Sequence, residues 1–299
     1  MKKRLFYGFL CFLAVSMLLS AAVCADTGPK PSVHIRFENM PDALCYGTLL
    51  SKTDSTGPSS AWDGVSEYYD HEYGEEGRSI WQAFVNYEDA DGFYFLQQWW
   101  ECSETQPLDW TYYPPQTFKI LLYYPESGAF AVSDICQRYA FDSYFSVDAA
   151  TMRASVLNAD GTKQFNLTAE TDYDYARALL SLVCRIAITI LIELAVALPF
   201  GLRQKKLLPL IAGINVITQI ILNLALEAIG FRQGYYAFVA YYILFELLVF
   251  ALEAFLYSRL FFKKGAAVSK RRAVAYAFAA NACSFAGGLV ISNLIPGIF

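Results

Sequence analysis

The sequence predicts a multi-domain membrane protein: a β-rich, sandwich-like extracytoplasmic domain at residues 26–174, followed by an α-helical bundle of four transmembrane helices at 175–299. Three observations predict it. The 299 residues are 56% hydrophobic and only 17% charged, which is too apolar for an ordinary soluble protein. Between residues 26 and 174 the chain carries 24 acidic and 8 basic residues. Four long apolar segments with few charges follow.

The first 25 residues have the pattern of a secretory signal peptide. Residues 2–4 are basic and residues 5–23 are apolar, and the small side chains of Val23 and Ala25 favour cleavage after Ala25. The apolar stretch is also long enough to persist as a signal anchor. Cys24 suggests a lipoprotein as a third reading, but a lipobox needs Gly or Ala where this chain has Val23. The sequence therefore favours cleavage.

Short segments rich in aromatic and β-branched residues, separated by Pro, Gly, Asp and Ser, predict strands in the domain that follows. Residues 32–37 alternate polar and apolar side chains, as a half-buried strand does. We expect strands at 32–37, 44–51, 92–101, 117–124 and 129–134, a hairpin loop at 124–128, and a helix at 79–88. This spacing favours a small β-sandwich with one helical insertion.

Three cysteines lie in this domain: Cys45, Cys102 and Cys136. Outside the cell, two of them could form a disulfide and leave one free thiol. Three buried thiols are the alternative. The chain has no CxxC pair, so redox or zinc-ribbon chemistry has no support.

We predict no metal and no cofactor. The acidic loop at 63–76 offers oxygen ligands, but a solvated loop is the simpler reading. The segment from Asp89 to Gly92 resembles an EF-hand until Gly92 is placed at the turn, because Tyr87 and Gln98 then occupy ligand positions. An acidic domain also argues against binding nucleic acid. Five tryptophans in the domain either build its core or form a platform for a carbohydrate or peptide.

Four apolar segments are each long enough to cross a bilayer, which makes the lipid bilayer the first partner of the chain. They cover about 178–200, 207–229, 235–262 and 273–298. The loops around 201–206 and 259–272 are basic, whereas the loop between the second and third spans has only Arg232. By the positive-inside rule these two basic loops are cytoplasmic, and the domain and the C-terminus are extracytoplasmic, in the cell membrane.

Polar residues inside the spans are the candidate site, because a charged side chain in hydrocarbon is costly. We expect a polar seam of Arg185, Glu193, Asn215, Gln219, Glu246, Glu253, Asn281 and Ser284. Arg185 is expected to neutralise Glu246, which leaves Glu193 and Glu253 without a basic partner. These acids could hold a proton or a cation. The alternative is that hydrogen bonds along the seam only lock the bundle.

Small residues recur at every fourth position of the last span, at Ala280, Ser284, Gly288 and Ser292. Such a stripe lets another helix approach closely. Packing within the chain and formation of a homo-oligomer are both open.

Several enzyme classes lack their residues in this sequence. The two histidines, His34 and His71, both precede the spans, so an intramembrane metalloprotease or a rhomboid-like Ser/His dyad has no support. No phosphate-binding GxxxxGK[ST] occurs either. Carboxylate pairs for glycoside hydrolysis are too numerous for any one pair to stand out.

Five strings carry a resemblance to a known group of proteins: TGPKPSV at 27–33, TLLS at 48–51 with STGP at 55–58, AFDSY at 140–144, and ITQIILN at 217–223. With them the chain resembles uncharacterised membrane proteins of Gram-positive-type bacteria. The resemblance covers most of the chain and implies the two-part design. It implies no substrate and no functional residue.

These observations favour a non-enzymatic envelope protein whose outer domain binds or senses an unknown ligand or protein and whose bundle anchors it. A transport component for an ion or small solute, with Glu193, Glu246 and Glu253 along its path, is the alternative. An exported hydrolase is the third and weakest reading.

Overall fold

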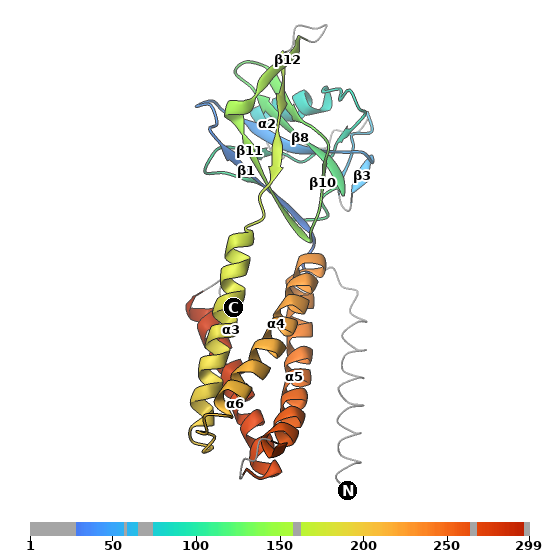
Figure 1. Cartoon of the computed structure of the whole chain (residues 1–299). Helices are drawn as coiled ribbons and strands as arrows, with labels where there is room; N and C mark the ends of the chain where they lie inside the picture. The colour runs from blue at the N-terminus through green and yellow to red at the C-terminus, as the bar shows by residue number, and fades with distance from the viewer. Residues whose placement is uncertain (1–27, 57–58, 65–73, 158–162, 264–267, 296–299) are drawn as a thin grey trace.

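The structure is a computed structural model that describes residues 28–56, 59–64, 74–157, 163–263 and 268–295. A β-rich domain stands on one end of a bundle of long helices (Figure 1). The last strand ends at Thr171 and the first helix of the bundle begins at Tyr175. The predicted signal peptide and its cleavage after Ala25 lie outside the described residues, as does most of the acidic loop.

The β domain contains two main sheets. The four-stranded sheet has the order β14 (Ala169–Thr171), β11 (Asp142–Asp148), β1 (Ser32–Glu38) and β7 (Leu108–Trp110). The larger sheet has the order β12 (Arg153–Leu157), β13 (Lys163–Leu167), β9 (Ala129–Ser133), β8 (Thr117–Tyr124), β2 (Tyr46–Ser51) and β5 (Tyr94–Phe95), with β6 (Trp100–Glu101) on β2 and β10 (Cys136–Gln137) on β8. The short strands β3 (Ser55–Thr56) and β4 (Ser59–Ser60) pair separately. Strand β1 is parallel to β11, and β13 is parallel to β9.

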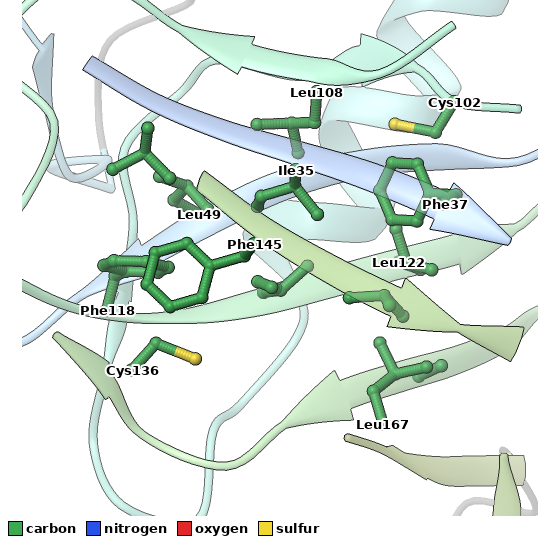
Figure 2. Packing of buried hydrophobic residues seen from close by; sticks show 14 of the residues in the cluster. Ile35, Phe37, Leu49, Cys102, Leu108, Phe118, Leu122, Cys136, Phe145 and Leu167 are labelled. Atoms are coloured by element: carbon green, nitrogen blue, oxygen red, sulfur yellow. The ribbon is translucent and has the colours of Figure 1, made fainter. Parts of the chain in front are cut away.

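The two main sheets share one hydrophobic core. Alternate side chains of β1, among them Ile35 and Phe37, point into it and meet Phe118 and Leu122 from β8 (Figure 2). This is the alternation that the sequence of β1 predicts. Strand β8 is apolar without interruption from Ile120 to Tyr124 because both of its faces are buried: helix α2 (Gly74–Val85) packs Phe84 and its neighbours on the opposite side.

The predicted strands at 32–37, 44–51, 117–124 and 129–134 are confirmed within two residues. The predicted strand at 92–101 is confirmed only in part: β5 and β6 both lie within it, but the chain leaves the sheet between them at Gln97, whose φ is 60°. The predicted helix at 79–88 is shifted, since α2 begins at Gly74 and ends at Val85. Strands β7, β11, β12, β13 and β14 were not predicted.

The three cysteines of the β domain are free and buried, so the structure contains no disulfide among Cys45, Cys102 and Cys136. Burial raises the pKa of Cys45 to about 12 and also raises the pKa of Cys102 and Cys136. The alternative of three buried thiols therefore describes the structure. Most of the tryptophans belong to the hydrophobic core of the β domain or pack against it. Trp81 and Trp110 are buried, and Trp99 and Trp100 pack against the hydrophobic clusters.

Within the described residues, four helices form the bundle: α3 (Tyr175–Ala197), α4 (Leu208–Gln233), α5 (Tyr235–Lys263) and α6 (Lys270–Leu294). Each is long and apolar enough to cross a membrane, and each contacts two others in the cyclic order α3, α4, α5, α6. Their starts follow local chemistry, since the side chains of Asp174 and Ser269 accept backbone N–H groups at the starts of α3 and α6. The turn between α4 and α5 lies next to the β domain, and the connection between α3 and α4 lies at the far end (Figure 1).

Candidate functional site

A polar cluster lies in the middle of the bundle, and all four helices contribute to it. We call Glu193 of α3, Asn215 and Thr218 of α4, Glu253 of α5 and Asn281 of α6 the carboxylate cluster. The Nδ2 atom of Asn215 donates to Glu193 Oε2 at 2.6 Å. Thr218 Oγ1 and Asn281 Nδ2 donate to the two oxygens of Glu253, each at 2.7 Å. Both glutamates and both asparagines are 0% exposed.

Two tyrosines border the carboxylate cluster on the side away from the β domain. Asn215 Nδ2 lies 2.9 Å from the Tyr257 hydroxyl, and the Tyr276 hydroxyl donates to the backbone oxygen of Glu193 at 3.2 Å. Both rings belong to the hydrophobic core at that end of the bundle, together with Phe261 and Leu207. Aromatic packing therefore separates the cluster from the basic loops.

Three oxygen atoms of the carboxylate cluster have no hydrogen-bond partner among the described residues. They are Glu193 Oε1, Asn215 Oδ1 and Asn281 Oδ1. All three are acceptors, so the cluster has fewer donors than its oxygens require. A buried polar atom without a partner destabilises a fold unless something else satisfies it.

The remaining members of the predicted seam lie apart from the carboxylate cluster or at its edge. Ser284 Oγ donates to the backbone oxygen of Asn281 at 3.0 Å. Gln219 Oε1 accepts from Asn223 at 3.2 Å, one turn further along α4. Glu246 lies beside the hydroxyl of Tyr242 on its own helix. Thr218, Tyr257 and Tyr276 were not predicted, although Thr218 follows Asn215 by three residues and shares its helix face.

The predicted pairing of Arg185 with Glu246 is wrong. Arg185 Nη2 lies 3.8 Å from Glu227 Oε2 and donates to Ser181 Oγ at 2.9 Å. Helical side chains lean toward the N-terminus of their helix, which turns Arg185 toward the β domain and away from the carboxylate cluster. Glu227 lies near the end of α4 that faces the β domain, so the guanidinium of Arg185 pairs with Glu227 instead of Glu246.

The small-residue stripe faces the interior of the chain. Ala280 lies in the hydrophobic core of the bundle, and Ser284 and Gly288 are buried. The side chain of Ser292 lies outside the described residues. The structure thus gives Ala280, Ser284 and Gly288 a role in packing within the chain.

A second candidate site lies where the β domain meets the bundle. A cavity of about 520 Å³, which we call the junction pocket, is lined from the domain side by Tyr144, Asp172 and Tyr173 and from the bundle side by Arg185, Glu227 and Phe238. Its volume is in the range of small-molecule sites. Aromatic rings and charged groups of both signs line it, so it suits a molecule with polar and apolar parts.

Direct contacts hold the two parts together around the junction pocket. The Tyr173 hydroxyl donates to Glu227 Oε1 at 3.0 Å. Burial and the neighbouring Glu227 raise the pKa of Tyr173 to about 12, so its hydroxyl keeps its proton as a donor. The Phe231 ring contacts the rings of Tyr139 and Tyr173. The bundle and the domain are thus joined by packing as well as by the chain.

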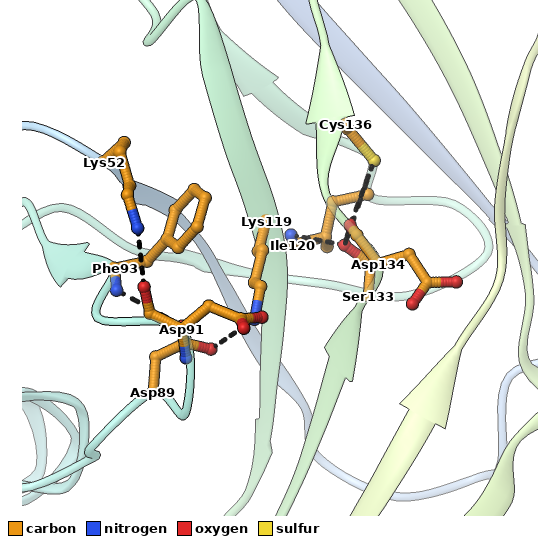
Figure 3. A network of polar contacts seen from close by, with 9 residues as sticks. All are labelled: Lys52, Asp89, Asp91, Phe93, Lys119, Ile120, Ser133, Asp134 and Cys136. Atoms are coloured by element: carbon orange, nitrogen blue, oxygen red, sulfur yellow. Dashed lines mark hydrogen bonds and ion pairs between the residues drawn. The ribbon is translucent and has the colours of Figure 1, made fainter.

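The aspartates of the failed EF-hand pattern bind a lysine. Lys119 Nζ donates to Asp89 Oδ1 at 2.8 Å and to Asp91 Oδ2 at 2.6 Å, and Lys52 donates to the backbone oxygen of Asp91 (Figure 3). The hydrogen bonds and charge of Lys119 lower the pKa of Asp91. Among the described residues, no group of three His, Cys, Asp or Glu side chains could hold a metal ion.

A chain of hydrogen bonds on the outer face of the four-stranded sheet includes a serine, a histidine and two aspartates. His34 Nδ1 lies 2.6 Å from Asp109 Oδ1, and its Nε2 lies 2.8 Å from Ser32 Oγ. Ser32 donates its one hydroxyl proton to Asp142 at 2.5 Å. A catalytic serine must instead donate to the histidine, so this arrangement differs from a Ser-His-Asp triad.

Comparison with known proteins adds no relative: no protein-family model, no curated protein and no solved structure matches the chain. The resemblance carried by residues 140–144 and 217–223 stays a prediction. Both strings contribute to the two sites, because Tyr144 lines the junction pocket and Thr218 belongs to the carboxylate cluster.

Proposed function

We propose that the chain is a multi-pass membrane protein of the cell envelope whose extracytoplasmic, sandwich-like β domain and bundle together bind a small molecule and respond to it. One observation carries this proposal: the junction pocket takes its walls from both parts. A ligand there would contact the domain and the bundle at once. Its binding energy would then depend on how the two parts are arranged, which is the requirement for a sensor.

The orientation is part of the same proposal. We infer that the β domain and the C-terminus are extracytoplasmic and that the loops around 201–206 and 259–272 are cytoplasmic. Arg203, Lys205 and Lys206 lie in the connection at the far end of the bundle from the β domain (Figure 1). Basic loops favour the cytoplasmic side. The junction pocket would then lie near the outer surface of the membrane.

Filling the junction pocket tests the proposal. Ala178 lines the pocket, so Ala178→Trp should occupy the space of the ligand. Leu180 is two residues away on α3 and is 61% exposed, so Leu180→Trp adds the same ring outside the pocket. Purified full-length protein in detergent would be screened by thermal shift against zwitterionic amino acids and peptides, sugar phosphates, and lysophospholipids.

We expect one of these three classes to raise the Tm of the wild type and of Leu180→Trp, but not of Ala178→Trp. Stabilisation grows with ligand concentration above Kd, so a titration should show a rise in Tm that follows occupancy. Equal shifts in all three proteins, or no shift in the wild type, would argue against a ligand in the junction pocket.

A transport component is the second candidate, and the observation that favours it is the carboxylate cluster at the centre of the bundle. Glu193 and Glu253 are fully buried there, as acids in ion paths are. Protein in liposomes should then move an ion, and Glu253→Gln should stop the flux. The hydrolase reading, which would use carboxylates of the β domain, lacks such support, because no one pair stands out among the many acids of that domain.

A further inference from the structure

The carboxylate cluster lacks a cation among the described side chains. The ion pairs of the described residues include none to Glu193 or Glu253, and Arg185 of α3 pairs with Glu227. The groups that face the two acids are Asn215 and Thr218 of α4, Tyr257 and Glu246 of α5, and Tyr276 and Asn281 of α6. These side chains are neutral or acidic. Two ionised carboxylates would therefore repel each other inside hydrocarbon.

The unpartnered oxygens indicate what the cluster needs. Glu193 Oε1, Asn215 Oδ1 and Asn281 Oδ1 each lack a donor. Exchanging the oxygen and nitrogen of the two asparagine amides does not supply the missing donors. Asn215 Nδ2 also donates to Ile211 O, and Asn281 Nδ2 donates to Ala277 O. After the exchange, each amide oxygen would face one of these backbone oxygens. Adding a proton to a carboxylate converts one acceptor into a donor. A bare cation would instead take several oxygens as ligands.

We propose that the carboxylate cluster binds one monovalent cation, H⁺ or Na⁺, shared between Glu193 and Glu253. The cation neutralises one of the two charges, and the unpartnered oxygens supply the remaining interactions. Because α3, α4, α5 and α6 each contribute a side chain, the cation ties the four helices together. This inference uses residues remote from the junction pocket and stands whether or not that pocket binds a ligand.

Infrared difference spectroscopy of the full-length protein in liposomes tests for the proton. A protonated buried carboxyl gives a C=O stretch that shifts in D₂O. If H⁺ is the occupant, we expect this band near neutral pH in the wild type, its loss or reduction in Glu193→Gln and Glu253→Gln, and no change in Glu126→Gln, which removes an exposed carboxylate. Glu253→Asp keeps the carboxyl at a new position and should shift the band, which covers the case in which a Gln variant does not fold.

A second experiment tests for Na⁺ by comparing the Tm of the protein in NaCl with its Tm in choline chloride at equal ionic strength. If Na⁺ is the occupant, NaCl raises the Tm of the wild type more than that of Glu253→Gln, and the carboxyl band is weak. If H⁺ is the occupant, the band is present and the two salts give the same Tm. A wild type with neither the band nor a sodium effect would overturn the proposal. A band that persists in both Gln variants, without a sodium effect, would also overturn it.

Discussion

The backbone N–H of Phe141, in the β domain, donates to the backbone oxygen of Phe231 near the end of α4 at 2.8 Å. The last four carbonyl groups of a helix have no partner within the helix. Phe231 is among the last residues of α4, so the β domain caps the helix. The oxygen of Phe141 in turn accepts from the N–H of Ser32 in β1. A continuous path of hydrogen bonds therefore runs from the four-stranded sheet into the bundle.

Gly234, in the turn between α4 and α5, is required for this contact. Its φ of 82° and ψ of −178° belong to a region that is open essentially to glycine alone, and a Cβ atom there would lie 2.5 Å from the Phe141 ring. We expect Gly234→Ala to destabilise the protein by roughly 1–3 kcal/mol. The Tm of the purified protein measures this loss.

Gly213→Ala is the control for that substitution. A Cβ atom at Gly213 meets nothing within 4 Å, and the residue lies in the interior of α4. Alanine is there expected to preserve or raise Tm, because it favours helix more than glycine. Equal losses in the two variants would mean that the Phe141 contact is unimportant.

Removing the Tyr173 hydroxyl should loosen the junction locally. Tyr173→Phe deletes the donor to Glu227 and should weaken the contact by roughly 1 kcal/mol. Hydrogen exchange should then rise in the last turns of α4 as well as near residue 173. Tyr175→Phe, at a residue that is 71% exposed, should leave exchange in α4 unchanged. Unaltered exchange in both variants would contradict coupling through Tyr173.

Lys119 stabilises the β domain by neutralising a buried acid. Asp89 is 1% exposed on its side chain, so Lys119→Met leaves its charge buried and unpaired. We expect a loss of roughly 3–5 kcal/mol in the free energy of unfolding. All five tryptophans lie in the β domain, so tryptophan fluorescence reports its unfolding separately from the bundle. A change in Tm no larger than that of Asp91→Asn, at a residue 58% exposed, would refute the role of burial.

The contact between Lys119 and Asp91 should also show in the pH dependence of stability. The contact lowers the pKa of Asp91 from the ordinary 3.8, so the carboxylate of Asp91 binds a proton less readily in the folded state than in the unfolded state. The stabilisation is then fully present above about pH 3.8 and is lost as the pH falls through the lower, folded pKa. The Tm values of wild type and Asp91→Asn should differ at neutral pH and converge in acid. A constant difference across this range would contradict the linkage.

The sequence predicts this fold best where one periodic signal dominates. The four apolar segments agree with α3 to α6 within a few residues, because crossing a bilayer demands length and little else. Strand β1 is equally clear, since its alternation reflects one buried face. Strand β11 was not predicted. It buries alternate residues, as β1 does, but Asp142, Ser143 and Ser146 give its sequence a polar composition. Its parallel pairing with β1 depends on a contact across more than a hundred residues.

The candidate sites show the same limit. Glu193, Asn215, Glu253 and Asn281 could be found from the sequence, because polar residues in apolar spans are conspicuous. The partner of Arg185 could not, since it depends on how α3 and α4 lie against each other. The junction pocket as a whole could not be predicted from the sequence. Its residues come from β11, from the link to α3 and from three helices. Arg185 is conspicuous in the sequence, but nothing there places it beside Tyr144 and Tyr173 of the β domain.

Labelling of introduced cysteines tests most directly whether the β domain lies outside the cell and the basic loops inside. Ser127→Cys places an exposed thiol in the β domain, and Lys205→Cys places one in the loop between α3 and α4. With a membrane-impermeant maleimide we expect residue 127 to react in intact cells and residue 205 to react only after the membrane is permeabilised. Reaction of residue 205 in intact cells, with residue 127 protected, would contradict the account.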